Sequence, residues 1–313
     1  MILNTGGRTD TVQYYSTWLL NRFREGYVLT RNPLFPNKVS RITLDPRTID
    51  VVVFCSKDYR PILPRLHEIS DRFRCYYHYT ITAYGKDIEP RVPDIETSLE
   101  TLKALSRMVG REKVAWRYDP VLLTERYCID RHLKTFEYMS SCLSPYIDRC
   151  IFSFVEMYKK LETNMPELKP LTEEEKEILA VGMGKIAKKY GIILQTCATQ
   201  GDYTQYGIYK SGCMTADIFQ RAFGIRFKRV SHSGNRAGCC CMESRGLGDY
   251  NSCPNGCRYC YANKDHVRAL ENYRQHDPNS PLLLGHLLPT DEVSESHQMS
   301  MLCVSEKTLF DLL

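Results

Sequence analysis

Three cysteines toward the C-terminus have the spacing of an iron–sulfur loop. In the segment Cys253-Pro-Asn-Gly-Cys257-Arg-Tyr-Cys260, three residues and then two residues separate the thiols. Four cysteine thiolates are the usual ligands of a [4Fe–4S] cluster. A loop that offers three of them can leave one iron open for a substrate or cofactor, as catalytic metal sites keep a free position. Gly256 lets the backbone turn sharply beside the cluster, and we expect Tyr259 to shield the cluster or to cover an adenine.

The neighbouring cysteines predict a second metal site. Eight of the 14 cysteines fall between positions 197 and 260. We expect a closed [4Fe–4S] cluster or a tetrahedral zinc site there. Its four ligands would be Cys197, Cys213, Cys239 and Cys241. Cys240 could replace either of its neighbours, and Cys197 and Cys213 could instead be small buried hydrophobic residues. The scattered cysteines are expected in the core: Cys55, Cys75, Cys128, Cys142, Cys150 and Cys303.

Charged and polar residues follow the predicted strands. In βα barrels the C-terminal ends of the strands converge on one face, where active sites form. Each such residue alone could be an ion pair or a loop cap, but their recurrence predicts an active-site mouth. The candidate catalytic residues are Arg8, Asp10, Lys57, His78, Arg117, Asp119 and Glu156. Gln195, at the end of the sixth strand, is a further candidate for binding a cofactor.

The first two-thirds of the chain alternates strand-like and helix-like segments. Short apolar, β-branched or aromatic runs predict strands at 41–44, 50–55, 75–82, 113–118, 150–155 and 192–196, after a short apolar start. Apolar residues at helical spacing predict helices over 12–23, 95–109 and 129–143. Thr172 and Glu175 form a capping box that starts another helix, which ends at Gly191. About six βα units around a parallel sheet favour a partial or full, TIM-like barrel over an open sheet.

The composition changes at about Phe227. The segment that follows is rich in Gly, Ser, Asn and Cys and has no sustained period, which predicts a structured loop rather than a packed element. Pro278, Pro281 and Pro289 mark the last stretch as a wrapping tail. We therefore expect a βα barrel over 1–226 and a Cys-rich extension with its tail over 227–313.

The overall composition fits a soluble globular protein in a reducing compartment. The chain has 313 residues, 43% of them hydrophobic and 25% charged, with a formal net charge of +5. We find no apolar run of membrane-spanning length and no basic stretch followed by an apolar run that would form a secretory signal. We expect a cytoplasmic protein with no membrane partner, in which clustered thiols bind metal rather than form disulfides.

The cysteine loop resembles the CxxxCxΦC signature of radical S-adenosylmethionine enzymes, where Φ is an aromatic residue. Cys253, Cys257, Tyr259 and Cys260 match it position by position. The resemblance implies that three cysteines bind the cluster and that the fourth iron chelates the amino and carboxylate groups of S-adenosylmethionine. In most such enzymes the loop follows the first barrel strand. Here it comes after all six predicted strands, so either the strand order is permuted or a C-terminal loop folds back over the barrel mouth.

A wider resemblance covers nearly the whole chain. It rests on the segments 8–10, 23–33, 78–85, 116–123, 194–198, 253–263 and 276–283. These look like the bacterial domain-of-unknown-function family numbered 1848, whose members are sometimes likened to DNA repair photolyases of the spore photoproduct lyase kind. The resemblance implies a barrel with an iron–sulfur motif and supplies no reaction.

These observations lead to one favoured function and two alternatives. The favoured one is an enzyme whose cluster cleaves S-adenosylmethionine reductively to act on a small-molecule or nucleic-acid substrate at the barrel mouth. It would use one or two [4Fe–4S] clusters and an electron donor such as flavodoxin or ferredoxin. The first alternative is a non-catalytic zinc or redox-cluster protein with a ligand-binding barrel. The second is photolyase-like repair of nucleic acid, which salt-sensitive binding to DNA or RNA would support.

Overall fold

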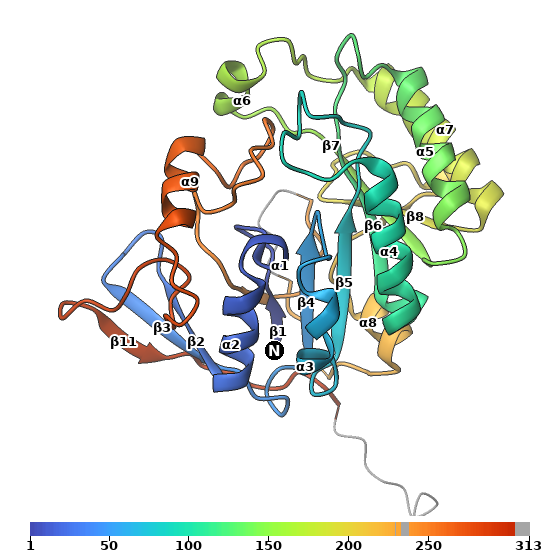
Figure 1. Ribbon diagram of the computed structural model, residues 1–313. Coiled ribbons are helices and arrows are strands. Elements are labelled where there is room, and N and C mark those ends of the chain that lie inside the picture. The colour runs from blue at the N-terminus through green and yellow to red at the C-terminus, as the bar shows by residue number, and fades with distance from the viewer. Residues whose placement is uncertain (229, 233–237, 304–313) are drawn as a thin grey trace, which may run out of the picture.

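A parallel sheet forms the centre of the molecule. The computed structural model describes residues 1–228, 230–232 and 238–303 (Figure 1). Among these residues, eight strands form one sheet in which every neighbouring pair is parallel. Across the sheet the strands are β10 (Ser244–Gly246), β1 (Ile2–Asn4), β4 (Val51–Ser56), β5 (Cys75–Thr80), β6 (Val114–Val121), β7 (Arg149–Phe154), β8 (Ile193–Cys197) and β9 (Tyr209–Ser211).

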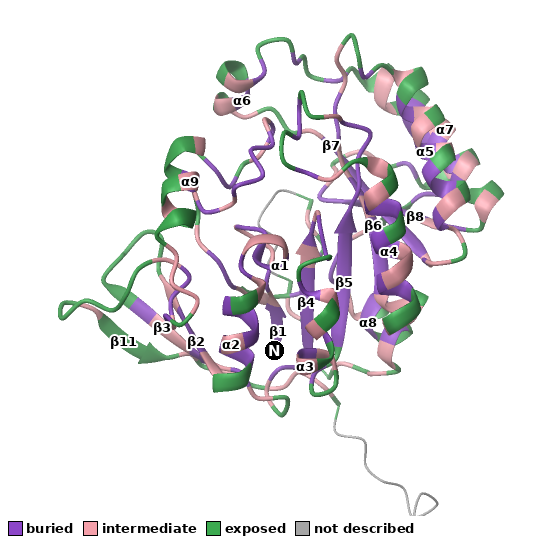
Figure 2. Ribbon diagram, in the orientation of Figure 1, coloured by how far each residue is buried: buried purple, intermediate pink, exposed green. Residues whose placement is uncertain are grey.

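Helices cover one face of this sheet. Because side chains alternate between the two faces of a strand, Val52 and Phe54 of β4 enter the same large hydrophobic cluster as Tyr77 and Tyr79 of β5. Helices that also contribute to this cluster include α2 (Ser16–Glu25), α3 (His67–Ser70), α4 (Ile95–Val109), α5 (Ile129–Leu143) and α7 (Glu173–Tyr190). Figure 2 shows buried strands and helices whose exposed residues face outward. The predicted α/β class with parallel strands is confirmed.

The opposite face of the sheet encloses a smaller cluster. Val53 of β4, Tyr76 of β5 and Ile151 of β7 belong to it. Helix α8 (Ala216–Phe223) adds Phe219, whose ring packs edge-on against Tyr76 with 5.8 Å between the centroids. A single cluster that is fed by strands from across the sheet indicates that the sheet curves around it. We call this the inner face.

The two edges of the sheet come close without pairing. Among the described residues, no strand ladder joins β10 to β9. The segments beside them do meet, since the backbone N–H of Met242 donates to the carbonyl oxygen of Met214 at 2.8 Å. Neither edge strand was predictable from the sequence, because three residues are too few to show a hydrophobic period. Closure into a full barrel stays a prediction.

A small second sheet lies beside the first. In it β2 (Tyr27–Arg31) pairs antiparallel with β3 (Lys38–Thr43), and β11 (Glu292–Glu295) pairs parallel with β3. The strand predicted at 41–44 therefore exists but lies outside the series of parallel strands. Its neighbour β2 precedes it by only a few residues, and so short a connection makes an antiparallel hairpin rather than a crossover.

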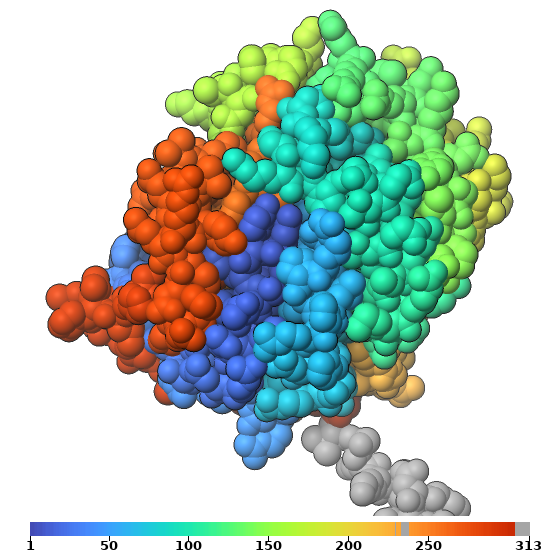
Figure 3. Space-filling model, in the orientation of Figure 1, coloured from blue at the N-terminus to red at the C-terminus, as the bar shows by residue number. Residues whose placement is uncertain are grey.

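The C-terminal segment packs on the N-terminal helices. The C-terminal segment, in orange, lies beside the blue N-terminal segment in Figure 3. Helix α9 (His266–Arg274) contacts α1 (Thr11–Tyr14) and the residue after it, since the Tyr273 ring packs edge-on against the rings of Tyr14 and Tyr15 with 5.5 Å between the centroids. Farther along, the indole N–H of Trp18 donates to the carbonyl oxygen of Ser280 at 2.9 Å. The remaining helix, α6 (Lys159–Asn164), follows β7. None of the helices in the described part of the chain is long and apolar enough to cross a membrane.

Candidate functional site

A cavity of about 140 Å³ lies at the C-terminal ends of β1, β4 and β5. Its lining comes from residues 6–10 after β1, residues 55–57 at the end of β4, Thr80 of β5, and the cysteine loop (residues 253–260) with the residues that follow it. We call it the loop cavity. One buried water needs roughly 10–15 Å³, so this space can hold a group of several atoms. In parallel α/β folds, ligands bind at this end of the strands.

Contacts from two sides hold the cysteine loop at the cavity. Asn255 accepts a hydrogen bond from the Tyr14 hydroxyl at 3.1 Å and donates to the Gln13 side-chain oxygen at 2.9 Å. From the other side, the Arg91 guanidinium donates to the carbonyl oxygen of Pro254 at 2.9 Å. The C-terminal loop thus folds back over the mouth of the sheet, which is one of the two arrangements that the sequence left open.

The three thiols of the loop are spread around the cavity. Cys253, Cys257 and Cys260 all line it, with Cys257 buried and the other two half-buried. Within the described chain, their sulfurs do not form a group that lies within 4.8 Å of one another. Thiolates that share one tetrahedral ion stand about 3.8 Å apart, because each metal–sulfur bond measures roughly 2.3 Å. The wider spacing suits thiolates that bind separate irons of one cluster. Gly256 makes the turn with a φ of +72°, where other residues are strained.

Asp10 is a buried carboxyl group in the lining of the loop cavity. Its side chain accepts hydrogen bonds from the backbone N–H groups of Gln13 and Lys57, both at 2.9 Å, and from the Ser56 hydroxyl at 2.7 Å. Burial raises the pKa of Asp10 to about 6, although these hydrogen bonds oppose the shift. Asp10 therefore carries a proton more readily than an exposed aspartate does. Arg8 lines the same cavity.

A buried ion pair fixes the aromatic residue of the loop. The Lys57 ammonium lies 2.8 Å from a Glu89 carboxylate oxygen, which also accepts from Thr82 at 2.8 Å and from the Tyr259 hydroxyl. Burial lowers the pKa of Lys57, but the Glu89 carboxylate and the Cys257 thiolate outweigh burial, so the net pKa shift is upward. The ammonium group of Lys57 therefore stays charged beside the cavity.

Two residues of this region were not among the sequence-predicted site residues. Glu89 lies between β5 and α4 in a segment with no hydrophobic period, so no pattern marked it. Cys55 was assigned to the core, but it lines the loop cavity. Its position at the end of β4, next to Lys57, was the available signal. Of the other scattered cysteines, Cys128 and Cys303 are exposed, which corrects their assignment to the core.

Three predicted catalytic residues lie away from the cavity, on the inner face. Within the described structure, His78, Arg117 and Asp119 do not belong to its lining. Arg117 forms an ion pair with Asp119, which also accepts a hydrogen bond from Ser153. The buried Nε2 of His78 has no hydrogen-bond partner among the described atoms. Burial lowers the pKa of His78 to about 4, so the imidazole is neutral at neutral pH.

Glu156 and Gln195 also lie outside the lining that the described residues form. Glu156 is exposed after β7. Gln195 is buried in β8, where its oxygen accepts from the Arg149 guanidinium and its amide donates to the carbonyl oxygen of Gly212 at 2.8 Å. These two bonds use both the oxygen and the nitrogen of the Gln195 amide. The residue therefore links β7 to the segment after β9.

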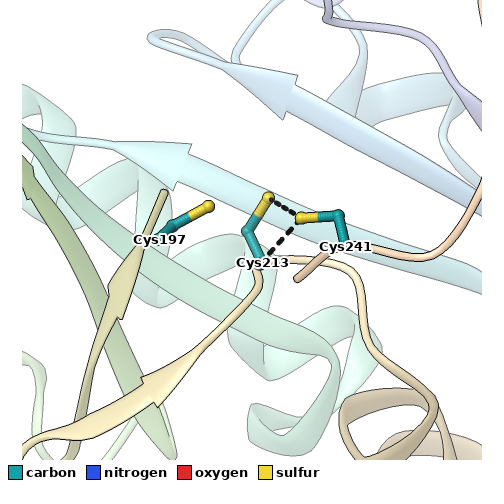
Figure 4. Close-up of side chains that lie close together, drawn as sticks. All are labelled: Cys197, Cys213 and Cys241. Carbon is teal, nitrogen blue, oxygen red and sulfur yellow. Dashed lines mark hydrogen bonds between the residues drawn. The ribbon is translucent and has the colours of Figure 1, made fainter. Parts of the chain in front are cut away.

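A second group of thiols gathers on the inner face. The sulfurs of Cys197, Cys213 and Cys241 all lie within 4.8 Å of one another and point together (Figure 4). The Cys213 and Cys241 sulfurs are 3.4 Å apart, and the backbone N–H of Cys213 donates to the Cys241 sulfur at 3.2 Å. Cys239 is half-buried beside them, whereas Cys240 is exposed. We call the group of Cys197, Cys213, Cys239 and Cys241 the thiol cluster.

The thiols of the thiol cluster differ in pKa because they lie so close together. Hydrogen bonding from Cys197 lowers the pKa of Cys239 to about 5 and also lowers that of Cys213. The pKa of Cys197 rises because its proton bridges to the neighbouring thiolates. Thiolates are the form of cysteine that binds metal.

Comparison with known proteins places the chain in a family. No curated protein and no solved structure matches it. A family model described as a domain of unknown function (DUF1848) matches residues 2–262. That range contains all strands of the parallel sheet, the thiol cluster and the cysteine loop. The chain therefore belongs to the family described as domain of unknown function DUF1848.

Proposed function

We propose that this protein is an iron–sulfur enzyme that cleaves S-adenosylmethionine reductively. The cysteine loop would hold a [4Fe–4S] cluster, and the loop cavity would receive S-adenosylmethionine. The observation that carries the proposal is the convergence of Cys253, Cys257 and Cys260 with Asp10 and Lys57 on one cavity at the C-terminal ends of the strands.

The donor set and the space fit such a cluster. Three thiols reach the cavity, and their sulfurs are too far apart to share a single ion. Burial raises the pKa of Cys253 to about 12, and burial together with the Glu89 carboxylate raises that of Cys257, where the Lys57 ammonium partly opposes the shift. A buried cation beside a thiolate lowers the free energy of its charged form.

The strand order supports the resemblance to radical S-adenosylmethionine enzymes. The cysteine loop follows β10 along the chain, and β10 is the edge strand next to β1. The loop thus comes after the first strand of the sheet in space, although it comes late in the sequence.

Several residues are placed to bind the charged ends of S-adenosylmethionine. The Arg8 guanidinium, which lies 5.4 Å from the centre of the Tyr250 ring, can pair with a carboxylate. Asp10 can accept a hydrogen bond from an amino or ribose hydroxyl group. Glu89 orients Tyr259 so that its ring forms part of the cavity wall. When bound, the cluster supplies the single electron that the cleavage needs, and flavodoxin or ferredoxin would restore it.

Production of 5′-deoxyadenosine tests the proposal. The full chain is reconstituted anaerobically with iron and sulfide and given dithionite and S-adenosylmethionine. We expect 5′-deoxyadenosine from the wild type and from Cys128→Ser, a control at an exposed cysteine. Cys257→Ser is expected to lose at least about 99% of this product, because the cluster loses one of its three ligands. Equal yields from Cys257→Ser and the wild type would refute the assignment.

A non-catalytic role is the second candidate, and the thiol cluster favours it. Three of its sulfurs lie within 4.8 Å of one another, and four cysteine ligands on one ion make a closed structural site rather than an open catalytic one. The two roles can coexist, because the thiol cluster and the cysteine loop use different residues. If the protein yields no 5′-deoxyadenosine but retains iron, a redox or ligand-binding role is preferred. Action on nucleic acid stays a prediction, tested by binding at low and high salt.

A further inference from the structure

The thiol cluster joins segments from the two edges of the parallel sheet. Cys197 ends β8, and Cys213 follows β9 at one edge. Cys239 and Cys241 precede β10, which forms the other edge. Among the described residues these edges share no strand ladder, so contacts near the cluster determine how they are held together.

The spacing of the sulfurs points to a single ion. Four thiolates at about 2.3 Å from one tetrahedral ion lie about 3.8 Å apart. The Cys213 and Cys241 sulfurs are 3.4 Å apart, and Cys197 is within 4.8 Å of both. The thiols of the cysteine loop do not satisfy this limit in the described structure. Cys197, Cys213 and Cys241 are therefore spaced for one shared ion, whereas the thiols of the cysteine loop are not.

Cys239, rather than the adjacent Cys240, is placed to be the fourth ligand. The Cys239 thiol is half-buried and close enough to Cys197 and Cys241 for them to lower its pKa, although among the described residues only Cys197, Cys213 and Cys241 satisfy the 4.8 Å limit. Cys240 is exposed, and its sulfur instead lies 3.7 Å from the carbonyl oxygen of Gly238. The alternation of side chains along an extended backbone explains why Cys239 and Cys241 share a side that Cys240 does not.

The backbone around the cluster is closely packed. A Cβ atom on Gly212 would lie 2.7 Å from the carbonyl carbon of Cys240 and from the nitrogen of Cys241. The backbone N–H of Met242 donates to the carbonyl oxygen of Met214 at 2.8 Å. Both contacts join the segment after β9 to the segment before β10, so an ion at the cluster would reinforce an existing junction.

We propose that Cys197, Cys213, Cys239 and Cys241 bind one zinc ion in a closed tetrahedral site that fastens the two edges of the sheet. Four thiolates leave no position for a substrate, so the site is structural. The backbone N–H of Cys213 donates a hydrogen bond to the Cys241 sulfur and so helps to fix the position of this ligand. The proposal is independent of the cluster at the cysteine loop, because zinc and iron are counted separately.

Metal content of the full chain and its variants tests this proposal. The proteins are purified anaerobically from medium that contains zinc and iron, and both metals are measured by mass spectrometry. We expect the wild type and Cys240→Ser to hold one zinc per chain, and Cys239→Ser to hold less than about a tenth of that. Cys257→Ser is expected to keep its zinc and lose iron.

A measurement on the wild type covers the case in which Cys239→Ser does not fold. X-ray absorption at the zinc edge should show four sulfur neighbours at about 2.3 Å. Nitrogen or oxygen neighbours in place of sulfur would overturn the proposal. So would equal loss of zinc from Cys240→Ser and Cys239→Ser. A wild type with about eight irons and no zinc would also overturn it, since the thiol cluster would then bind a second [4Fe–4S] cluster.

Discussion

Glu89 connects the parallel sheet to the cysteine loop through one carboxylate. It accepts hydrogen bonds from Lys57, Thr82 and Tyr259, and its side chain is 3% exposed. Glu89→Gln leaves the Lys57 ammonium buried without a countercharge. We expect the free energy of unfolding to fall by about 3 kcal/mol, since breaking a buried ion pair leaves an uncompensated charge. Urea denaturation of the metal-free protein measures this.

The matched control for Glu89→Gln is Glu100→Gln. Glu100 pairs with Lys103, but its side chain is 68% exposed, so water screens the pair. We expect Glu100→Gln to change the free energy of unfolding by less than about 1 kcal/mol. If the two variants lower the free energy of unfolding equally, the buried Lys57–Glu89 pair stabilises the fold no more than an exposed pair does.

At the residue scale, the sequence predicted those site residues that are marked by regular spacing or by a position after a strand. The loop cysteines were identified because their thiols repeat at fixed intervals, and the structure places all three on one cavity. Asp10 and Lys57 were identified from their places after strands, and both line that cavity. Glu89 could not be found in this way, because its contact with Tyr259 joins residues 170 positions apart. Gln195 was chosen because it lies near the end of its strand, but it is inside β8 and its side chain binds within the sheet.

Helix α5 is fastened to the sheet by a buried histidine. His132 Nδ1 lies 2.7 Å from the Tyr118 hydroxyl of β6, and Nε2 lies 2.8 Å from the carbonyl oxygen of Leu122. Burial lowers the pKa of His132 to about 4, well below the ordinary value of 6.5. Between these two pH values the unfolded chain binds a proton that the folded chain excludes. Stability from this residue is therefore complete above pH 6.5 and is lost as the pH falls toward 4.

Urea denaturation at pH 7 and at pH 4 measures this linkage. We expect His132 to contribute roughly 3 kcal/mol to the fall in the free energy of unfolding between them, since one pKa unit corresponds to about 1.36 kcal/mol. His132→Gln should have a smaller fall by that amount, although it is less stable at pH 7. His286→Gln, at an exposed histidine, should behave as the wild type does. Equal pH dependence in His132→Gln and the wild type would contradict the argument.

At the element scale, the long periodic segments were predictable. The helix expected over 95–109 is α4 (Ile95–Val109), and the capping box at Thr172 begins α7 with both of its hydrogen bonds present. The three-residue strands β9 and β10 were not, because each forms only next to a partner that the rest of the fold supplies. Strand β3 was found, but hairpin pairing rather than local pattern determines which sheet it joins.

Contact between the two edges of the sheet is a property of the whole molecule. Gly212 permits it, because a Cβ atom there would lie 2.7 Å from backbone atoms of Cys240 and Cys241. We expect Gly212→Ala to lower the free energy of unfolding by roughly 1–3 kcal/mol through this steric clash. Gly246→Ala is the control, since no atom lies within 4 Å of the added carbon. Chemical denaturation of both variants checks the prediction, and a Gly212→Ala protein as stable as the control would show that the edges separate freely.

The position of the cysteine loop at the C-terminal ends of the strands is also a property of the whole molecule. The sequence shows a Cys-rich segment after the predicted barrel, with two possible placements. Contacts of Asn255 with Gln13 and Tyr14 decide between them by bringing the loop to β1. These contacts join residues more than 240 positions apart, so no local pattern could have indicated them.

Electron paramagnetic resonance of the reduced protein, with and without S-adenosylmethionine, tests the central claim most directly. The anaerobically reconstituted chain should contain about four irons and give the signal of a reduced [4Fe–4S] cluster. Adding S-adenosylmethionine should change that signal in the wild type, because one iron has no cysteine ligand. In Cys257→Ser we expect no signal that changes on adding S-adenosylmethionine, because the cluster loses a ligand. A protein without iron, or a cluster whose signal is the same with and without S-adenosylmethionine, would contradict it.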